Sequence, residues 1–340
     1  MRHAVVVCDV GPAYGSGHAM RCLALAEELI SRGTAVTYLA DVASVRWVHE
    51  RVAALGAVVV APPSDPDALP SAVVDLGADA VVVDSYHLAP GVYAALRATG
   101  LPTLAFVDQH LRGADADLLL DANIGSDDDV VELPDGTRRL AGLDYALIRR
   151  DVREHRPPSP QRLQGSGARP RVLGIFGGTD PAGAGVLVAD ALVRTGLAFE
   201  ATIVAPRPEL VDAVHALAPG PGQALHTISP TDRLPALVAE SDVVLSAAGT
   251  STWELLCLGA ATGLVCTADN QTIGYARALD AGVGLGVGDV ADDGFVEAAV
   301  RPLRRLLTET DLRSALSSSA WRTVDGRGAS RVADALESLG

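Results

Sequence analysis

Two glycines and a histidine stand close together near the N-terminus, in the run Gly15-Ser16-Gly17-His18. The run follows a short apolar segment and opens a helical pattern, where free backbone N–H groups and the helix dipole favour an anionic ligand. A neutral imidazole in that first turn could take a proton from an attacking group. A glycine-rich turn with a histidine of no chemical role explains the run equally well. Because residue 20 is Met, the run is not the GxGxxG pattern of a dinucleotide site.

A second pair of glycines opens the second half of the chain, in Phe176-Gly177-Gly178-Thr179-Asp180-Pro181. Gly177 and Gly178 would allow a diphosphate or another substrate group to approach the backbone closely. Thr179 or Asp180 could instead cap the helix that follows, since both residue types are good N-caps. A substrate contact and a capped strand-to-helix turn are therefore two open interpretations of this run.

Small and hydroxyl-bearing residues fill a third run, Ser246-Ala247-Ala248-Gly249-Thr250-Ser251-Thr252-Trp253-Glu254, which starts another helical pattern. Small residues and hydroxyls at a helix N-terminus suit a nucleotide diphosphate. Glu254 lies one turn into the helix and could accept hydrogen bonds from both hydroxyls of a ribose. It could also be a first-turn partner of the helix dipole, which is worth under about 1 kcal/mol.

Polar residues follow several other apolar runs. The amides of Asp269-Asn270-Gln271 could hold sugar hydroxyls, although an ordinary polar loop explains this run as well. Weaker signals of the same kind are Asp84-Ser85-Tyr86-His87 and Asp108-Gln109-His110. The sequence has no HxH, HExxH or Cys/His cluster, so we expect no metal and no cofactor.

The elements that would position these residues are short apolar runs alternating with helical patterns. Valine-rich runs of this length are typical of parallel strands that are buried on both faces, and their alternation with helices predicts doubly wound sheets. In the first half the runs cover residues 4–7, 35–40, 57–61, 80–84, 103–108 and 118–121. In the second half they cover residues 172–176, 201–205, 226–228, 243–247 and 262–265.

A segment rich in proline, glycine and polar residues, 155–170, separates the two series of runs and has the composition of a linker. We therefore predict an N-terminal domain over 1–155, a linker over 156–170 and a C-terminal domain over 171–340. The last segment, 312–339, has a helical pattern, and its final helix could pack back on the first domain. Two such domains would face a central cleft at the carboxyl ends of both sheets, where ligands of doubly wound folds bind.

Composition excludes several classes of function. Of the 340 residues, 49% are hydrophobic, which is ample for a core, and the net charge is −15 without a basic cluster, which argues against a nucleic-acid partner. There is no lysine, so Schiff-base chemistry is excluded. The four cysteines form no CxxC pair and stand among apolar residues, which predicts reduced thiols and a cytoplasmic location. No apolar run has the length of a signal peptide or a membrane span.

Taken in order, these motifs give the chain a resemblance to a known family. It resembles the UDP-sugar hydrolases of the pseudaminic-acid pathway (PseG-like) and the spore-coat SpsG-like proteins, and more distantly the N-acetylglucosaminyltransferase of peptidoglycan synthesis. The residues that carry the resemblance are GSGHAMRCLALAEEL, DSY, LLLDAN, YALIRRD, FGGTDP, SAAGTSTWELLCLG, DNQ and VDGRGASRVA.

The resemblance implies a GT-B fold with two Rossmann-like domains, in which the C-terminal domain holds UDP. It also implies that His18 is the catalytic base, with Tyr86 and Asn270 near the sugar and residues 249–254 on the diphosphate and ribose. The candidate substrate-binding residues are Gly15, Gly17, Arg21, Asp108, His110, Gly177, Gly178, Thr179, Asp180, Ser246, Gly249, Thr250, Ser251, Glu254 and Gln271.

Two positions depart from the hydrolases that the chain resembles, and both belong to the N-terminal domain. Val7 stands where those proteins usually have Arg, and Gln109 stands where they usually have the second Asp of a pair. These departures favour a glycosyltransferase that moves a sugar from a UDP-sugar to a small acceptor, such as a nucleobase or an aminosugar, without a metal. Hydrolysis with water as the acceptor is the first alternative, and a nucleotide-sugar-binding module without turnover is the second.

Overall fold

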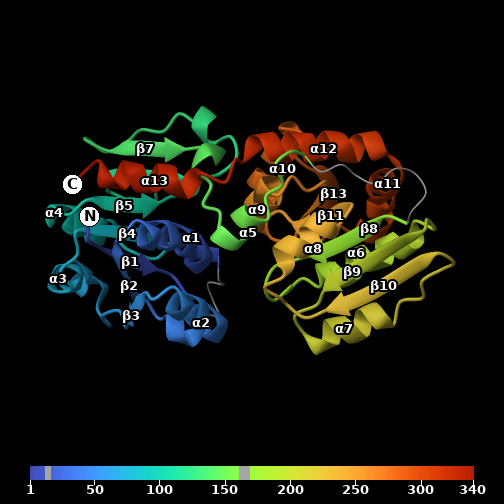
Figure 1. The fold of residues 1–340 in the computed structure, drawn as a ribbon, viewed down its shortest axis with the longest axis horizontal. Coiled ribbons are helices and arrows are strands. Elements are labelled where there is room, and N and C mark those ends of the chain that lie inside the picture. The colour runs from blue at the N-terminus through green and yellow to red at the C-terminus, as the bar shows by residue number, and fades with distance from the viewer. Residues whose placement is uncertain (12–16, 161–168) are drawn as a thin grey trace. The chain divides into compact units, whose positions relative to one another are not determined.

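The computed structural model describes residues 1–11, 17–160 and 169–340, and these residues divide into two units. The first unit contains residues 1–150 and 326–340, and the second contains residues 151–325. Each unit is a parallel sheet with helices packed against it (Figure 1). Gly15 and Ser16, the first half of the glycine-histidine run, lie outside the described residues.

In the described part of the first unit, seven strands form one sheet in the order β3-β2-β1-β4-β5-β6-β7, and every neighbouring pair is parallel. The strands are β1 (His3–Cys8), β2 (Ala35–Leu39), β3 (Val58–Val60), β4 (Ala80–Asp84), β5 (Thr103–Phe106), β6 (Leu118–Asp121) and β7 (Arg138–Ala141). The helices of this unit are α1 (Gly17–Ser31), α2 (Arg46–Ala54), α3 (Leu69–Asp75), α4 (Pro90–Ala98) and α13 (Gly328–Glu337), and α5 (Arg150–Glu154) starts at its boundary.

The apolar run of β1 fills the core on both faces of this sheet. Ala4, Val6 and Cys8 join the cluster that includes the buried residues of α1, while Val5 and Val7 join the cluster that includes those of α3 and α4. Successive side chains of a strand point to opposite faces, so a strand covered on both sides must be apolar at every position. This is why a continuous valine-rich run, rather than an alternating one, forms the central strand.

In the described part of the second unit, six parallel strands follow the order β10-β9-β8-β11-β12-β13. The strands are β8 (Arg171–Ile175), β9 (Phe199–Val204), β10 (Gln223–Ile228), β11 (Val243–Ala247), β12 (Thr262–Cys266) and β13 (Leu285–Asp289). The helices are α6 (Ala184–Arg194), α7 (Pro208–His215), α8 (Leu234–Glu240), α9 (Ser251–Cys257), α10 (Thr272–Asp280), α11 (Phe295–Thr308) and α12 (Thr310–Thr323).

Both sheets have the strand order of the doubly wound Rossmann fold, which confirms the predicted fold class. Each of the eleven apolar runs of the sequence overlaps one strand of the structure, but no run predicted β7 or β13. β7 carries Arg138 and Arg139, and β13 carries Gly286 and Gly288. Both are edge strands, which contact only one neighbouring strand and therefore need less apolar surface.

The C-terminal segment is shared between the units. α12 belongs to the second unit and α13 to the first, where the start of α13 lies directly against the 3₁₀ turn η4 (Leu143–Tyr145). A Cβ atom at Gly328 would lie 2.2 Å from the carbonyl oxygen of Ala146, so only glycine fits there. Arg331 then donates to the carbonyl of Asp144 at 2.8 Å. Two motifs far apart in the sequence, YALIRRD and GRGASRVA, are therefore packing partners.

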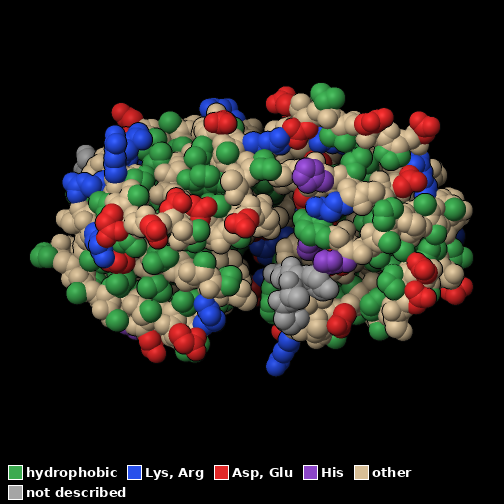
Figure 2. Space-filling model, turned by 180° about the vertical axis from the view of Figure 1, so that it is seen from behind, with side chains coloured by type: hydrophobic (Ala, Val, Ile, Leu, Met, Phe, Trp, Pro, Cys, Tyr) green, Lys and Arg blue, Asp and Glu red, His purple; other side chains and the backbone are tan. Residues whose placement is uncertain are grey.

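Other expectations concern the thiols and the surface. All four cysteines are buried and free. Among the described residues, no helix combines the length and the apolar character needed to cross a membrane. On the face drawn in Figure 2, acidic and arginine side chains are interspersed with apolar and neutral ones.

Candidate functional site

The site of the first unit lies where its strand order reverses, between β1 and β4. The last residues of these strands, Cys8 and Asp84, are partners in the ladder, and the N–H of Asp9 donates to the carbonyl of Asp84 at 3.0 Å. Ligands of doubly wound sheets bind at this reversal, outside the carboxyl ends of the strands. The register therefore brings the start of α1 and the residues after β4 to the same place.

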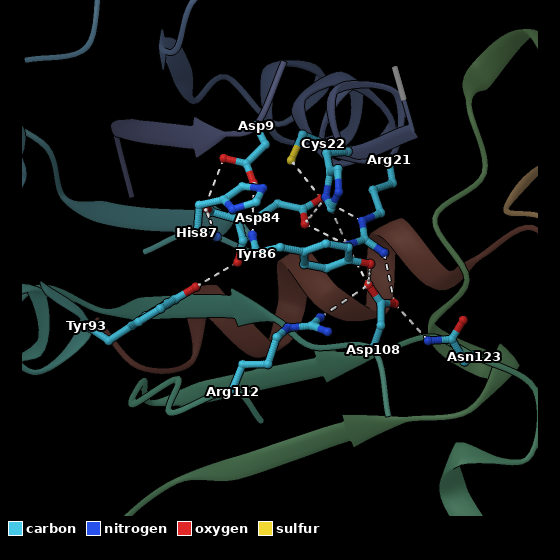
Figure 3. A network of polar contacts seen from close by, with 12 residues as sticks. Asp9, Arg21, Cys22, Asp84, Tyr86, His87, Tyr93, Asp108, Arg112 and Asn123 are labelled. Carbon is cyan, nitrogen blue, oxygen red and sulfur yellow. Dashed lines mark hydrogen bonds and ion pairs between the residues drawn. The ribbon is translucent and has the colours of Figure 1, made fainter. Parts of the chain in front are cut away.

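His18 and Asp84 form a hydrogen-bonded pair at this point (Figure 3 draws the surrounding network). The Nδ1 atom of His18 lies 2.7 Å from Oδ1 of Asp84, whose side chain is fully buried. Burial alone would raise the pKa of Asp84, but Arg21 and His18 outweigh it and lower that pKa. Nη2 of Arg21 also lies 3.3 Å from Nδ1, but the carboxylate is closer and can only accept, so we assign the proton to Nδ1 and leave Nε2 as the free ring nitrogen.

Arg21, one turn after His18 on α1, joins two carboxylates, the buried Asp84 and the partly buried Asp108. Its Nε and Nη2 donate to Asp84 at 2.5 and 2.6 Å, and its Nη1 and Nη2 donate to Asp108 at 3.0 Å each. Burial opposes ionisation of Asp108, but Arg21, Tyr86 and Asn123 more than offset it and hold its pKa well below the usual range. Both carboxylates therefore stay charged, and the guanidinium fixes their positions.

Tyr86 connects the histidine to this ion cluster. Its ring meets that of His18 edge to face, with centroids 4.4 Å apart, and its hydroxyl donates a short hydrogen bond to Asp108. Burial and the charge of Asp108 raise the pKa of Tyr86 to about 12, so it remains a neutral phenol at physiological pH. The guanidinium of Arg112 stacks on the same ring, 3.9 Å from its centroid (Figure 3).

Asp9 holds the turn that carries Tyr86. Its carboxylate accepts the hydroxyl of Ser85 at 2.9 Å and the backbone N–H of Tyr86 at 2.8 Å. The Nε2 atom of His87 lies 4.0 Å from the same carboxylate. The turn after β4 is thus anchored to the end of β1, which fixes the base of Tyr86.

The cluster continues across the sheet to its far edge. The Nδ2 atom of Asn123 donates at 2.8 Å to both Asp108 and Asp121, and Nη2 of Arg139 donates to Asp121 at 3.0 Å. Asp121 is buried and ends β6, and Arg139 comes from β7. Charged and polar side chains therefore form a continuous chain along the carboxyl ends of β4 to β7.

The remaining candidates of the first unit are placed less centrally. Gly17 is the first residue of α1. His110 is exposed, and its backbone forms an isolated bridge with Asp108. Between them, Gln109 has a φ of 63°, a left-handed conformation that is uncommon outside glycine. Of the first-unit candidates, the structure brings together His18, Arg21, Tyr86 and Asp108.

In the second unit, the first candidate loop follows β8. Gly177, Gly178 and Thr179 are exposed, and a Cβ atom at either glycine would meet nothing within 4 Å. Asp180 is buried instead, and its carboxylate accepts the N–H groups of Ala184 and Gly185, both at 2.9 Å. Asp180 thus caps α6, while the residues before it present open backbone.

The second candidate loop of this unit follows β11, across the strand reversal from the first. Thr250 and Ser251 are exposed at the start of α9, and Glu254 is partly buried in its first turn. Ser246 is only 1% exposed, and its hydroxyl donates to the carbonyl of Ala247 at 3.1 Å. The surface of this loop is therefore formed by the residues after Ser246.

The third candidate loop follows β12, the strand beside β11. A Cβ atom built on Gly249 would lie 3.7 Å from Nε2 of Gln271, so the two loops meet there. The Oε1 atom of Gln271 accepts from the backbone N–H of Thr267 at 3.0 Å and from its hydroxyl at 3.1 Å. Asn270, next to Gln271 in the turn η5 (Asp269–Gln271), is exposed.

Several members of the first-unit cluster were not among the candidate site residues, Asn123 and Arg112 among them, and Asp84 stood only in one of the weaker signals. Asp84 and Asn123 follow buried strands, as Tyr86 and Asp108 do, so their positions at strand ends were the available signal. Arg112 stands in a loop and has no comparable signal. Among residues 1–11, 17–160 and 169–340, no group of three or more His, Cys, Asp or Glu side chains has an arrangement that could hold a metal ion.

No protein-family model and no curated protein matches this sequence. Solved structures do match it over nearly its whole length. MurG of Acinetobacter baumannii is 16% identical with a TM-score of 0.75, and the match covers 99% of this chain and all of that one. The glycosyltransferase of kitacinnamycin is 17% identical with a TM-score of 0.67, over 99% of this chain and 98% of that one.

A protein named as a UDP-N-acetylglucosamine 2-epimerase from Listeria monocytogenes also matches, at 13% identity and a TM-score of 0.68, over 99% of this chain and 96% of that one. Several further matches are glycosyltransferases, one of them complexed with thymidine diphosphate, and another match is complexed with UDP. At these identities the likeness shows the fold: the chain has the two-domain GT-B fold of these glycosyltransferases.

Proposed function

We propose that the protein is a GT-B glycosyltransferase that moves a sugar from a UDP-sugar to a small acceptor without a metal, with His18 as the general base. The observation that carries this proposal is the pair of His18 and Asp84. The Nδ1 atom of His18 lies 2.7 Å from the buried, ionised carboxylate of Asp84, which leaves Nε2 of His18 to act as the base. The glycosyltransferase neighbours support the reaction class.

In the proposed reaction, Nε2 of His18 takes the proton of an acceptor O–H or N–H group. The freed electron pair forms the new bond to the anomeric carbon, and the bond from that carbon to the diphosphate oxygen breaks, so UDP leaves with its electron pair. Asp84 stabilises the imidazolium that forms, because it already accepts from Nδ1. Arg21 acts as a positioning residue, since it fixes the carboxylate that orients the histidine.

On the donor side, we propose that the second unit holds the nucleotide. Open backbone at Gly177 and Gly178, and the exposed hydroxyls of Thr250 and Ser251 at the start of α9, suit a diphosphate. Glu254 is the proposed partner of the ribose hydroxyls, and Asn270 and Gln271 are proposed to contact the sugar. Asp180 would act on this site indirectly, since its carboxylate is used to cap α6.

The test is a measurement of UDP release from a panel of UDP-sugars, with and without small hydroxyl- and amine-bearing acceptors, and with products identified by mass spectrometry. We expect release that depends on an acceptor, and a decrease of about a hundredfold or more in His18→Ala. The matched control is His215→Ala, since that histidine lies on α7 of the second unit and contacts Thr227.

Each other outcome of this measurement contradicts a stated part of the proposal. Equal release without any acceptor would show a hydrolase, and a changed UDP-sugar without release would show an epimerase. UDP binding without turnover of any donor would show a binding module. Turnover of thymidine diphosphate sugars alone would show that the donor nucleotide is not UDP. Unchanged turnover in His18→Ala would show that His18 is not the base.

A further inference from the structure

Arg112 is a cation at the edge of the first-unit cluster whose hydrogen-bonding capacity is not used by the described residues. Its guanidinium stacks on Tyr86 and makes no hydrogen bond within the described part of the chain, and its side chain is 37% exposed. Its carboxylate partner, Asp108, lies 3.9 Å from Nη2, which is beyond hydrogen-bond range. Arg21, in contrast, directs four hydrogen bonds at two carboxylates.

Asp108 has little hydrogen-bonding capacity left for Arg112. Its two oxygens already accept two hydrogen bonds from Arg21, one from Tyr86 and one from Asn123. The phenol of Tyr86 is neutral and offers Arg112 only the face of its ring. The charge of Arg112 is balanced within the cluster, where Arg21 and Arg112 face the carboxylates of Asp84 and Asp108, but the N–H donors of Arg112 are not used by the described residues.

The loop that carries Arg112 is anchored rather than simply exposed. Arg112 itself has a φ of 48°, a left-handed conformation that is unfavourable in a residue other than glycine. The next residue, Gly113, has a φ of 75° and packs so closely on Pro90, the first residue of α4, that a Cβ atom would lie 2.5 Å from its ring. The fold therefore holds the guanidinium in place despite this strain.

His18 and Arg112 contact the same phenol ring. The ring of His18 lies 4.4 Å from the centroid of Tyr86, and the guanidinium carbon of Arg112 lies 3.9 Å from it. A molecule whose nucleophile reaches Nε2 of His18 thus has a guanidinium with unused hydrogen-bond donors one ring away. A guanidinium matches carboxylate and phosphate oxygens in both charge and geometry.

We propose that Arg112 is a specificity residue that binds an anionic group of the acceptor, so that the acceptor is a small carboxylate- or phosphate-bearing molecule. That the bound molecule is the acceptor rests on the proposed transfer reaction, whereas the anion site itself does not depend on it. Tyr86 supports the guanidinium of Arg112 with its ring, and the alcohol or amine of the bound acceptor would face His18.

The experiment is a titration of the full-length protein with methyl phosphate in one arm and acetate in the other, followed by the ring resonances of Tyr86 and His18 in NMR spectra. We expect at least one anion to shift both rings. Arg112→Gln should weaken that binding by about tenfold or more, and Arg112→Lys should restore part of it. Arg305→Gln is the charge-matched control, since Arg305 pairs with Glu309 on the surface of α11 and should change nothing.

Equal anion binding in Arg112→Gln and Arg305→Gln would overturn the proposal. So would a titration in which neither anion shifts the ring resonances of Tyr86 and His18. A saturating amount of UDP should leave the anion bound, and displacement by UDP would assign Arg112 to the donor instead of the acceptor. Because no sugar donor is present, the result does not depend on turnover. Arg112-dependent binding without any UDP release from sugars would contradict the transfer reaction, while release without Arg112-dependent binding would contradict this inference.

Discussion

At the carboxyl end of the first sheet, charged side chains pair with one another and are largely buried, whereas at that of the second sheet glycines and hydroxyls lie at the surface. Asp84 and Asp108 share the guanidinium of Arg21 in the first unit. In the second unit, the carboxylate of Asp180 accepts backbone N–H groups at the start of α6, and Thr250 and Ser251 are exposed. The two sheets have the same strand order but present different chemistry at the same edge.

This difference indicates how the two ends could divide a reaction. A general base must keep one geometry and one tautomer, and a network of charge-assisted hydrogen bonds provides both. A bound diphosphate needs N–H and O–H donors and free space, which open backbone and hydroxyl side chains provide. Changes in the first network should therefore alter catalysis and stability together, while a change in the second should alter stability through one helix.

The largest effect is expected from Asp84→Asn. The amide would turn its N–H₂ group toward a donor of Arg21, so the partly buried guanidinium would lose a partner. In the orientation that replaces Oδ1, the amide would also remove the acceptor for Nδ1 of His18. We expect turnover to fall by about a hundredfold or more, and the free energy of unfolding to fall by about 3 kcal/mol. Turnover rates and thermal melting of the same preparation measure both.

The matched control for that change is Asp190→Asn, which breaks the surface pair of Asp190 with Arg194 on α6 and should change the free energy of unfolding little. A stable Asp84→Asn protein with normal turnover would show that the buried network is not required by the reaction. Lost stability with normal turnover would leave Asp84 a purely structural residue.

An intermediate effect is expected from acid. The pKa of Asp108 is lower in the folded protein than the value of about 3.9 in an unfolded chain, because Arg21, Tyr86 and Asn123 outweigh its burial. Its stabilisation is therefore complete above about pH 4 and is lost as the pH falls toward the folded value. Melting curves between pH 6 and about pH 2.5, which cover the upper part of that window, should show a smaller pH dependence in Asp108→Asn than in the unchanged protein.

The contrary result would be an identical slope of melting temperature against pH in the two proteins. In that case the protons taken up below about pH 4 belong to other carboxylates, and the coupling of Asp108 to Arg21 adds little to stability. The Asp190→Asn variant again serves as the control, because its carboxylate lies on the surface beside Arg194.

Most of the fold could be predicted from the sequence because its central strands are buried on both faces. β1 is apolar from Ala4 to Cys8 and β4 from Ala80 to Val83, so their runs are continuous and easily seen. The edge strands β7 and β13 could not be found in this way, since a strand with one neighbour tolerates Arg138 and Gly288. The placement of α13 in the first unit depends on tertiary contacts, above all at Gly328.

The site was predictable where strand ends carry distinctive residues and was not where partners come from elsewhere. His18, Tyr86 and Asp108 follow strands, and the structure joins them in one cluster. The pairing of His18 with Asp84 depends on the hydrogen-bonded ladder between β1 and β4, and the sequence alone does not show which strands are neighbours. Arg112 depends on a left-handed loop residue, for which no sequence pattern exists.

The smallest effect is expected in the second unit, from Asp180→Ala. The variant would leave the N–H groups of Ala184 and Gly185 without their acceptor at the start of α6, which should cost about 1 kcal/mol. Because Asp180 is 2% exposed and uses its oxygens within the helix start, UDP affinity should change less than in Thr250→Ala, whose hydroxyl is exposed. Calorimetric titration with UDP and thermal melting of both variants test this ordering. A larger loss of affinity in Asp180→Ala than in Thr250→Ala would mean that the second unit, like the first, depends on a buried carboxylate to shape its site.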